Sequence, residues 1–371
     1  MDLVEVLEGK ARILVPDVPR LKGPGRKHSG FYNPLMSFNR DVSVIVLAAL
    51  AARGEVRRPL DGMAGTGIRG VRWALEVPGV EVGINEPSRV GAELVRKNVE
   101  LNGAKASIYA TGVASAAMEH KADLVDIDPF GSPVPFFFPV VQNIRKGFVS
   151  VTATDTAALT GTIPRVTARR YHATVSRSSI THEVGLRTLI GALVRDAARV
   201  DRELVPLLCH YADHYYRCYF RVRRNAIGAD RALAMISKIE WEGRQIGPMW
   251  AGNICEKEMM GSLRYENWSD SLRLESPPQD RIHRLLGTLA DESTVELDGL
   301  PVVGFYRVDN IAQETRTEPM SPDALVELLR SAGRTASRTH FDPGGVRTNA
   351  SKEEVLSIVR SKASPAAPKA R

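Results

Sequence analysis

The segment Asp128-Pro129-Phe130 has the residue types best suited to chemistry in this sequence. An exocyclic amino group on a nucleobase is a poor nucleophile because its lone pair is delocalised into the ring. Asp128 and the carbonyl of Pro129 suit the task of accepting both N–H bonds and turning the lone pair toward a methyl donor. Asp128 can also take up the released proton, and Phe130 can stack on the base. An isolated Asp-Pro-Phe is more often an ordinary turn, so the segments before it decide its meaning.

A glycine-rich turn precedes this segment, because residues 61–67 read Asp-Gly-Met-Ala-Gly-Thr-Gly. Gly65 and Gly67 allow backbone conformations that a side chain forbids, and they let the main chain approach a bound nucleotide. Apolar residues at helical spacing follow, so a helix N-terminus would face an electronegative ligand. Gly65, Gly67 and Gly70 also match the dinucleotide fingerprint, with Glu86 about 20 residues further on. The turn alone therefore leaves NAD, S-adenosylmethionine and a purely structural role open.

Two predicted strands that end in acidic residues decide between these ligands. Residues 80–86 are expected to form a strand that ends at Glu86, whose carboxylate suits both hydroxyls of a ribose. Residues 122–128 are expected to form another that ends at Asp128. A hydride-transfer enzyme has no evident use for an Asp-Pro-aromatic turn there, whereas an amino-group methyltransferase does. The order of these signals favours S-adenosylmethionine.

Three further side chains are candidates for this site. Arg40 and Arg69 could each pair with the carboxylate of a methionine moiety. For a lone arginine, a solvated surface position is the more common role. Phe31 follows a basic loop at residues 22–30, and is either a second aromatic face for a base or an anchor for that loop.

Strand and helix signals alternate from about residue 31 to about residue 155, which predicts an α/β domain with a mostly parallel sheet. The chain has 371 residues, enough for two domains. Its composition shifts near Asn225. We therefore expect a catalytic domain over residues 1–224 and an α+β domain over residues 225–371.

Arg217, Arg221 and Arg223 alternate with aromatic residues near the end of the first of these domains. This pattern is typical of an edge strand with one solvated face, and it fits contact with RNA equally well.

The chain has 50 Lys and Arg against 43 Asp and Glu, a net charge of +7, which is consistent with a polyanionic partner. Its three cysteines form no C-x-x-C pair, so neither a disulfide framework nor a thiolate zinc site is supported. The start lacks the features of a secretory signal, and the longest apolar run, at residues 42–52, is too short to span a bilayer. We expect a monomeric, cytoplasmic protein whose apolar run is a buried helix.

Several segments of the chain resemble the tRNA (guanine-26-N2)-dimethyltransferases of the archaeal type. They occur in order over most of the sequence: residues 31–34, 39–41, 67–70, 98–103, 126–133, 152–156, 182–187, 213–217 and 337–341. The resemblance implies a class I, Rossmann-like methyltransferase domain, tRNA as partner, and methyl transfer from S-adenosylmethionine to N2 of guanine 26.

The resemblance also implies roles for individual residues. Asp128 would be catalytic, while Phe31 and Phe130 would bracket a flipped guanine. By this resemblance Arg40, Arg69 and Glu86 would hold S-adenosylmethionine, with Val113 and Ala114 near the adenine. The glycine-rich turn itself adds Asp61, Gly65 and Gly67 to the residues expected near this ligand.

Basic residues in both domains are expected to contact tRNA phosphates, because extrusion of a base from tRNA costs a few kcal/mol. They are Lys22, Arg26 and Lys27 in the loop before Phe31, and Arg334 and Arg338 in the second domain.

The sequence departs from the family pattern in two places. Paired cysteines that hold zinc in many members are missing from the C-terminal half, so we predict no metal. An acidic residue expected before the adenine contacts is missing at residues 111–115, which leaves the contacts of the adenine pocket open. An NAD-dependent oxidoreductase and a catalytically inactive RNA-binding module remain the alternatives. Whether a neighbouring guanine is also modified, and whether one or two methyl groups are added, stays open.

Overall fold

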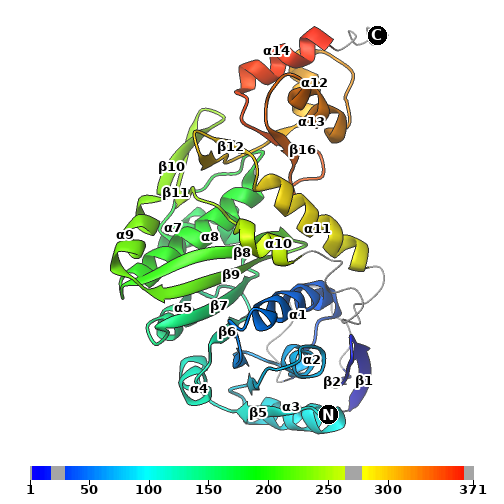
Figure 1. The fold of residues 1–371 in the computed structure, drawn as a ribbon, viewed down its shortest axis with the longest axis vertical. Coiled ribbons are helices and arrows are strands. Elements are labelled where there is room, and N and C mark those ends of the chain that lie inside the picture. Colours follow the sequence, from blue (N-terminus) through cyan, green and yellow to red (C-terminus); the bar gives the residue numbers. More distant parts are fainter. Residues whose placement is uncertain (1, 18–29, 264–277, 363–371) are drawn as a thin grey trace.

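The computed structural model describes residues 2–17, 30–263 and 278–362, and over these residues a seven-stranded sheet forms the centre of the protein (Figure 1). Its strands, in spatial order, are β5 (Ala106–Tyr109), β4 (Val82–Asn85), β3 (Pro59–Asp61), β6 (Leu124–Ile127), β7 (Lys146–Ala153), β9 (Tyr215–Arg224) and β8 (Arg202–Ala212). The first five are parallel, and β9 is antiparallel to both of its neighbours. The predicted α/β fold is confirmed.

The strand order reverses between β3 and β6, and such a switch point opens a crevice at the carboxyl ends of the strands. Helices cover both faces of the sheet. On one face α2 (Ile68–Glu76) packs against α1 (Ser37–Ala52) and α3 (Arg89–Leu101). On the other, α5 (Val134–Val141) packs against α4 (Val113–His120) and α8 (Thr181–Ala198). We call the edge formed by the carboxyl ends of β3, β4 and β6 the catalytic edge.

Helix α1 lies in the protein core. Together with the short helix η1 (Pro34–Met36) it is long and apolar enough to cross a membrane, yet 72% of an apolar 18-residue stretch within it is buried inside the protein. Residues Val42 to Leu50 are almost completely covered. The prediction of a buried helix is confirmed.

The N-terminal hairpin β1 (Leu3–Glu8) and β2 (Ala11–Pro16) packs beside α2 and α3. After β7 come the short α6 (Thr156–Leu159) and α7 (Pro164–Tyr171). They follow the carboxyl end of β7, which runs parallel to β6, and Tyr171 contacts Ser132, so this part of the chain lies next to the catalytic edge.

The C-terminal half contains two kinds of structure. Helix α9 (Ala226–Ala234), the hairpin β10 (Ile236–Trp241) and β11 (Arg244–Trp250), and α10 (Lys257–Ser262) continue the packing of α8 and β8, and α11 (Pro278–Glu292) packs on α10 and α1. The hairpin β12 (Glu296–Leu297) and β13 (Leu300–Pro301) then leads to a small unit at one end of the molecule (Figure 1). That unit consists of β14 (Tyr306–Arg307), α12 (Val308–Thr315), α13 (Pro322–Ser331), β15 (Ala336–Arg338), β16 (Gly345–Thr348) and α14 (Lys352–Lys362).

The protein has two hydrophobic cores, and the division between them lies further along the chain than the composition shift near Asn225. Met249 and Trp250 belong to the large core, and so does Phe305. Ten buried residues between Val308 and Val359 form a separate core, while Phe341 belongs to the large one. The predicted boundary after Arg224 therefore does not coincide with the division between these cores, because the segment after β9 still packs on α8. A functional division at residue 224 stays a prediction.

Strand β9 corrects a second expectation, because it lies inside the sheet instead of at its edge. Arg217 is completely buried, and Arg221 forms an ion pair of 2.6 Å with Glu256. The interpretation that these two arginines contact RNA is therefore wrong. Arg223 is exposed, but it pairs with Lys146 at the start of β7, so it lies at the edge opposite the catalytic one.

A buried ion pair joins the small C-terminal unit to α8. Nη1 of Arg347 on β16 lies 2.9 Å from Oε1 of Glu183, and Nε of Arg187 reaches the same oxygen at 2.9 Å. Nearby, His340 donates through its backbone N and pairs through Nδ1 with Glu292, at 3.0 and 2.7 Å. The family-like segments 182–187 and 337–341 thus each contribute a residue to these buried contacts, which gives both a structural role.

We expect Arg347→Ala to destabilise the protein by about 3–5 kcal/mol, because the fully buried Glu183 would lose a partner. Arg338→Ala is the matched control, since its 3.2 Å pair with Asp323 is exposed and such pairs contribute about 0–1 kcal/mol. Denaturant unfolding measures both. A loss for Arg347→Ala as small as that for the control would contradict this role.

Candidate active site

The glycine turn at residues 61–67 lies at the catalytic edge, directly after β3. Gly65 and Gly67 have φ angles of +57° and +82°, as the sequence predicted. A Cβ on Gly65 would lie 2.8 Å from the carbonyl oxygen of Phe31, so the turn packs closely against that backbone. Asp61 is buried beneath, where its Oδ2 accepts a hydrogen bond of 3.0 Å from Gly70, and burial raises the pKa of Asp61 to about 7. Asp61 therefore shapes the turn from below.

Glu86 lies across the same turn. One of its carboxylate oxygens accepts a hydrogen bond from the backbone of Gly65 at 3.0 Å, and the other accepts one from Ser88 at 3.1 Å. Burial raises the pKa of Glu86, while these two N–H groups oppose that shift. Ser88 also caps α3 by accepting a hydrogen bond from Gly91, which confirms the predicted cap. The carboxylate is half-buried at the end of β4, beside the turn.

Asn85 connects three loops of the catalytic edge, a role that the sequence analysis missed. Its amide donates to the carbonyls of Gly62 and Thr111 at 2.9 and 3.1 Å, and it accepts from the backbone N of Thr111 at 3.2 Å. Val113 and Ala114 follow at the start of α4, the first buried and the second half-buried. A polar residue at the last position of an otherwise apolar strand was the available signal.

Asp128 meets Arg69 directly after β6. Nη2 of Arg69 pairs with Oδ2 of Asp128 and donates to Asn39 at 2.9 Å, while its Nε lies 3.0 Å from Asp126. Arg69 is buried, whereas the side chain of Asp128 is 20% exposed. In this structure Arg69 is therefore a counterion of two aspartates. Its Nη1 is buried without a hydrogen-bond partner among the described residues, and its pairing with the carboxylate of a methionine moiety stays a prediction.

Asp126 anchors this arrangement from within the sheet. Nη2 of Arg217 lies 2.5 Å from Asp126, and Nη1 of Arg217 donates to Thr152 at 3.0 Å. Burial would raise the pKa of Asp126, but Arg217 and Arg69 outweigh it and lower that pKa. Asp126 thus stays ionised and fixes the guanidinium that holds Asp128. The sequence analysis found Asp126 and Arg217 only as parts of family-like segments.

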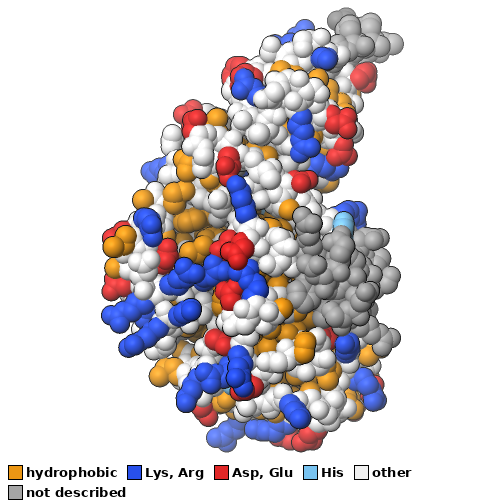
Figure 2. Space-filling model, in the orientation of Figure 1, with side chains coloured by type: hydrophobic (Ala, Val, Ile, Leu, Met, Phe, Trp, Pro, Cys, Tyr) orange, Lys and Arg blue, Asp and Glu red, His pale blue; other side chains and the backbone are white. Residues whose placement is uncertain are grey.

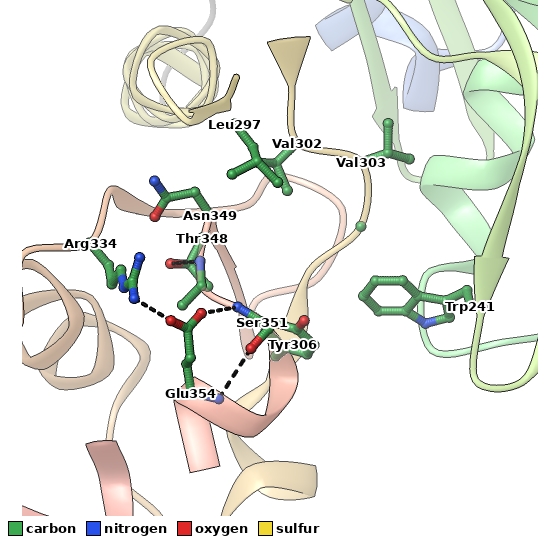
Figure 3. A pocket seen from close by; sticks show the side chains of 12 residues that line it. Trp241, Leu297, Val302, Val303, Tyr306, Arg334, Thr348, Asn349, Ser351 and Glu354 are labelled. Carbon is green, nitrogen blue, oxygen red and sulfur yellow. Dashed lines mark hydrogen bonds and ion pairs between the residues drawn. The ribbon is translucent and has the colours of Figure 1, made fainter. Parts of the chain in front are cut away.

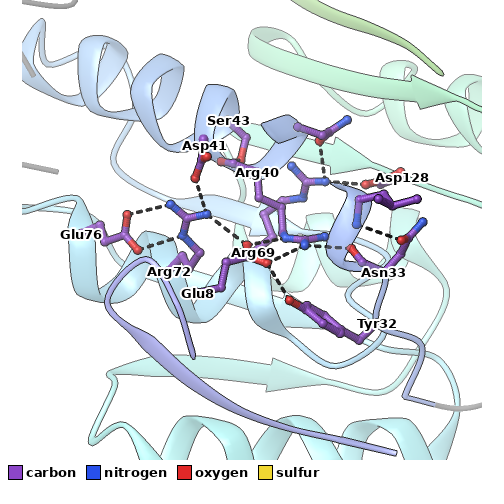
Figure 4. Close-up of polar contacts among 12 residues, drawn as sticks. Glu8, Tyr32, Asn33, Arg40, Asp41, Ser43, Arg69, Arg72, Glu76 and Asp128 are labelled. Carbon is purple, nitrogen blue, oxygen red and sulfur yellow. Dashed lines mark hydrogen bonds and ion pairs between the residues drawn. The ribbon is translucent and has the colours of Figure 1, made fainter. Parts of the chain in front are cut away.

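Arg40 forms a bidentate ion pair with Glu8 of the N-terminal hairpin (Figure 4). Its Nε and Nη2 lie 2.6 Å from the two carboxylate oxygens, and Nη2 also donates to the carbonyl of Asn33 at 3.0 Å. Arg72 approaches Glu8 at 3.0 Å and Asp41 at 2.6 Å. Glu8 therefore holds the segment that leads from Phe31 into α1, a role that no pattern in the sequence indicated.

Phe31 and Phe130 touch each other at the mouth of the site. Their ring centroids are 4.7 Å apart and their planes are 79° apart, an edge-to-face contact. A base stacked between two rings needs about 3.5 Å on each side. The structure thus brings the two predicted aromatics together, but they must separate before a base can enter between them. Phe130 is 51% exposed, so it has space to move.

Comparisons with known proteins identify the family of this chain. The family model described as N2,N2-dimethylguanosine tRNA methyltransferase matches residues 9–243 and 236–360. The chain belongs to this family. The tRNA (guanine(26)-N(2))-dimethyltransferase of Thermoplasma acidophilum is 33% identical over 95% of this chain and 96% of its own. That of Saccharolobus islandicus is 34% identical over 97% of this chain and all of its own.

A solved structure of a relative agrees with the whole fold. It is Trm1 from Pyrococcus horikoshii in complex with S-adenosyl-L-methionine, with a TM-score of 0.82 and 30% sequence identity. The alignment covers 96% of this chain and 99% of that one. These comparisons support neither an NAD-dependent oxidoreductase nor a catalytically inactive RNA-binding module.

Of the five residues predicted to contact tRNA, the structure describes two, Arg334 and Arg338, and both pair with acidic residues. Arg334 pairs with Glu354, and Arg338 pairs with Asp323 and donates to the carbonyl of Pro343 at 2.7 Å. Both side chains are about 40% exposed. The other three, Lys22, Arg26 and Lys27, lie outside the described residues.

Arg334 also lines a cavity of about 390 Å³ between Trp241 and the C-terminal unit (Figure 3). Glu354 there pairs with Arg334 and accepts a hydrogen bond of 2.8 Å from the backbone of Ser351. Since these polar groups pair with one another, and Asp128 lies elsewhere, we assign this cavity no part in the reaction.

Among the residues that the structure describes, no group of three or more His, Cys, Asp or Glu side chains is arranged to hold a metal ion. The three cysteines of the chain, Cys209, Cys218 and Cys255, are buried thiols.

Proposed function

We propose that this protein transfers methyl groups from S-adenosylmethionine to N2 of guanine 26 in tRNA, and that Asp128 is its catalytic residue. Membership of the N2,N2-dimethylguanosine tRNA methyltransferase family supports the reaction. The position of Asp128 is the observation that supports its catalytic role. Its partly exposed carboxylate lies at the catalytic edge, fixed by a buried arginine and followed directly by the exposed ring of Phe130.

The residues around the glycine turn suit S-adenosylmethionine. The half-buried carboxylate of Glu86 can accept hydrogen bonds from both ribose hydroxyls. Nε and Nη2 of Arg40 are engaged by Glu8, so Nη1 is the part that would meet a carboxylate of the ligand. Val113 and Ala114 offer an apolar contact for adenine. When bound, S-adenosylmethionine supplies a methyl group on a positively charged sulfur.

The amino group of guanine would be held by Asp128 and the carbonyl of Pro129. Arg69 engages Oδ2 of Asp128, which leaves Oδ1 to accept one N–H bond while the carbonyl accepts the other. Both bonds orient the nitrogen lone pair, so that catalysis comes mainly from positioning. Asp128 takes up the released proton and passes it to solvent, because its side chain is partly exposed.

Phe31 and Phe130 would stack on the two faces of the extruded base. Base–aromatic stacking contributes about 1–3 kcal/mol per base, so Phe31→Ala and Phe130→Ala should each lower kcat/KM for tRNA about 5- to 150-fold. Phe130→Tyr keeps the ring and is the control. Affinity for S-adenosylmethionine should stay unchanged in all three. Normal methyl transfer by both alanine variants would contradict this arrangement.

The experiment that tests the function is nucleoside mass spectrometry of an unmodified tRNA incubated with the protein and S-adenosylmethionine. We expect N2-methylguanosine followed by N2,N2-dimethylguanosine at position 26. Methylation of a ring nitrogen, or of another base, would overturn the proposal. A cytoplasmic location and a monomeric state stay predictions.

A further inference from the structure

The exposed face of α7 carries two arginines beside the active site. Arg165 and Arg169 are one helical turn apart, and His172 follows at the end of the helix; all three are exposed. Thr167 and Tyr171, on the opposite face, are buried. Because residues four apart share a face of a helix, Arg165 and Arg169 form one basic surface, and His172 lies just beyond the helix at a φ of +51°.

Tyr171 fixes this helix to the loop that bears Asp128. Its hydroxyl donates to Asp155 at 2.6 Å and lies 2.7 Å from the hydroxyl of Ser132, which is four residues after Asp128. Arg170 adds an ion pair of 2.6 Å with Asp155. The basic surface therefore has a defined position relative to the catalytic carboxylate.

Arg165 and Arg169 differ from most arginines near the site in their lack of acidic partners. Within the described ranges, no Asp or Glu oxygen lies within 4.0 Å of either guanidinium, whereas Arg40, Arg69 and Arg170 all have such partners. Exposed Lys and Arg alone do not identify such a surface, because they are interspersed with Asp and Glu over the face visible in Figure 2.

In the absence of an anion the position of Arg165 is unfavourable, whereas Arg169 lies in the last turn of α7, where the helix dipole favours a cation. Arg165 lies in the first turn of α7, where the helix dipole disfavours a cation. Like charges four residues apart also destabilise a helix. A phosphate would remove both costs, and a guanidinium binds phosphate through two parallel hydrogen bonds.

We propose that the exposed face of α7, through Arg165 and Arg169, binds backbone phosphates of tRNA beside the nucleotide that enters the active site. This inference rests on the proposed function, because it takes tRNA as the substrate. Helix α7 would thus bind phosphates close to the active site. The predicted contacts of Arg334 and Arg338 lie in the C-terminal unit.

The test is the salt dependence of tRNA binding by the double variant Arg165→Gln/Arg169→Gln. Each lost phosphate contact lowers the slope of log K against log salt concentration by about 0.7–0.9, so the slope should fall by about 1.4–1.8. Affinity should fall about tenfold at low salt. Affinity for S-adenosylmethionine and kcat at saturating tRNA should not change. Arg165→Lys/Arg169→Lys should restore most of the slope.

The matched control is Arg223→Gln/Arg224→Gln, which removes the same charge from exposed positions at the opposite edge of the sheet. This control should leave the slope close to that of the unchanged protein. Equal losses in both double variants, or an unchanged slope in the α7 variant, would overturn the inference. Methylation of tRNA by the unchanged protein is measured in the same preparation; its absence would overturn the proposed function, while the binding slopes still decide the role of α7.

Discussion

Asp128→Ala is expected to lower kcat for tRNA methylation by about 10²–10⁴-fold, the range in which a positioned acid or base contributes. The variant loses both the acceptor that orients the amino group and the group that takes up its proton. Arg69 keeps Asp126 and Asn39 as partners, so the buried network should survive the change. Rapid-quench measurement of methyl transfer at saturating tRNA gives the rate.

Two controls separate chemistry from binding in this experiment. Affinity of Asp128→Ala for S-adenosylmethionine, measured by calorimetry, should stay close to that of the unchanged protein. Asp128→Asn should retain part of the activity, because an amide oxygen still accepts one hydrogen bond. A fully active Asp128→Ala variant would rule out the proposed role.

Glu86→Ala is expected to weaken the binding of S-adenosylmethionine about 100-fold or more. Hydrogen bonds to a charged group contribute about 1.5–3 kcal/mol each, and the carboxylate would lose two of them. Glu86→Gln should lose less, because its amide oxygen still accepts. Calorimetry with S-adenosylmethionine measures the effect, and tRNA affinity should change little.

Glu86 also accepts a hydrogen bond from Gly65, so its removal has a structural side. Thermal unfolding of Glu86→Ala and Glu86→Gln without ligand separates the two effects. If S-adenosylmethionine binds Glu86→Ala as tightly as the unchanged protein, Glu86 does not hold the ribose.

The parts of the site that were predictable from sequence depend on local patterns. Glycines at positive φ, an acid directly after an apolar strand, and a serine before a helix each act within a few residues. Gly65, Glu86 and Ser88 accordingly lie where their spacing indicated. The mostly parallel sheet could also be inferred, because alternating strands and helices favour it.

The partners of the charged residues could not be predicted, because they come from distant parts of the chain. Arg40 pairs with Glu8, 32 residues away, and Arg217 pairs with Asp126, 91 residues away. Neither spacing follows a helical or strand period. The internal position of β9 has the same cause, since the pattern of one strand does not reveal which strands flank it.

The measurement that tests the central claim most directly is methyl transfer to a tRNA with inosine in place of guanine 26. Inosine lacks the exocyclic amino group and keeps the rest of the purine ring, so the two tRNAs differ at the proposed acceptor alone. We predict that the inosine tRNA binds with similar affinity and receives no methyl group at position 26. Transfer to that inosine at the rate seen with guanine would contradict the assignment of N2 as the acceptor held by Asp128.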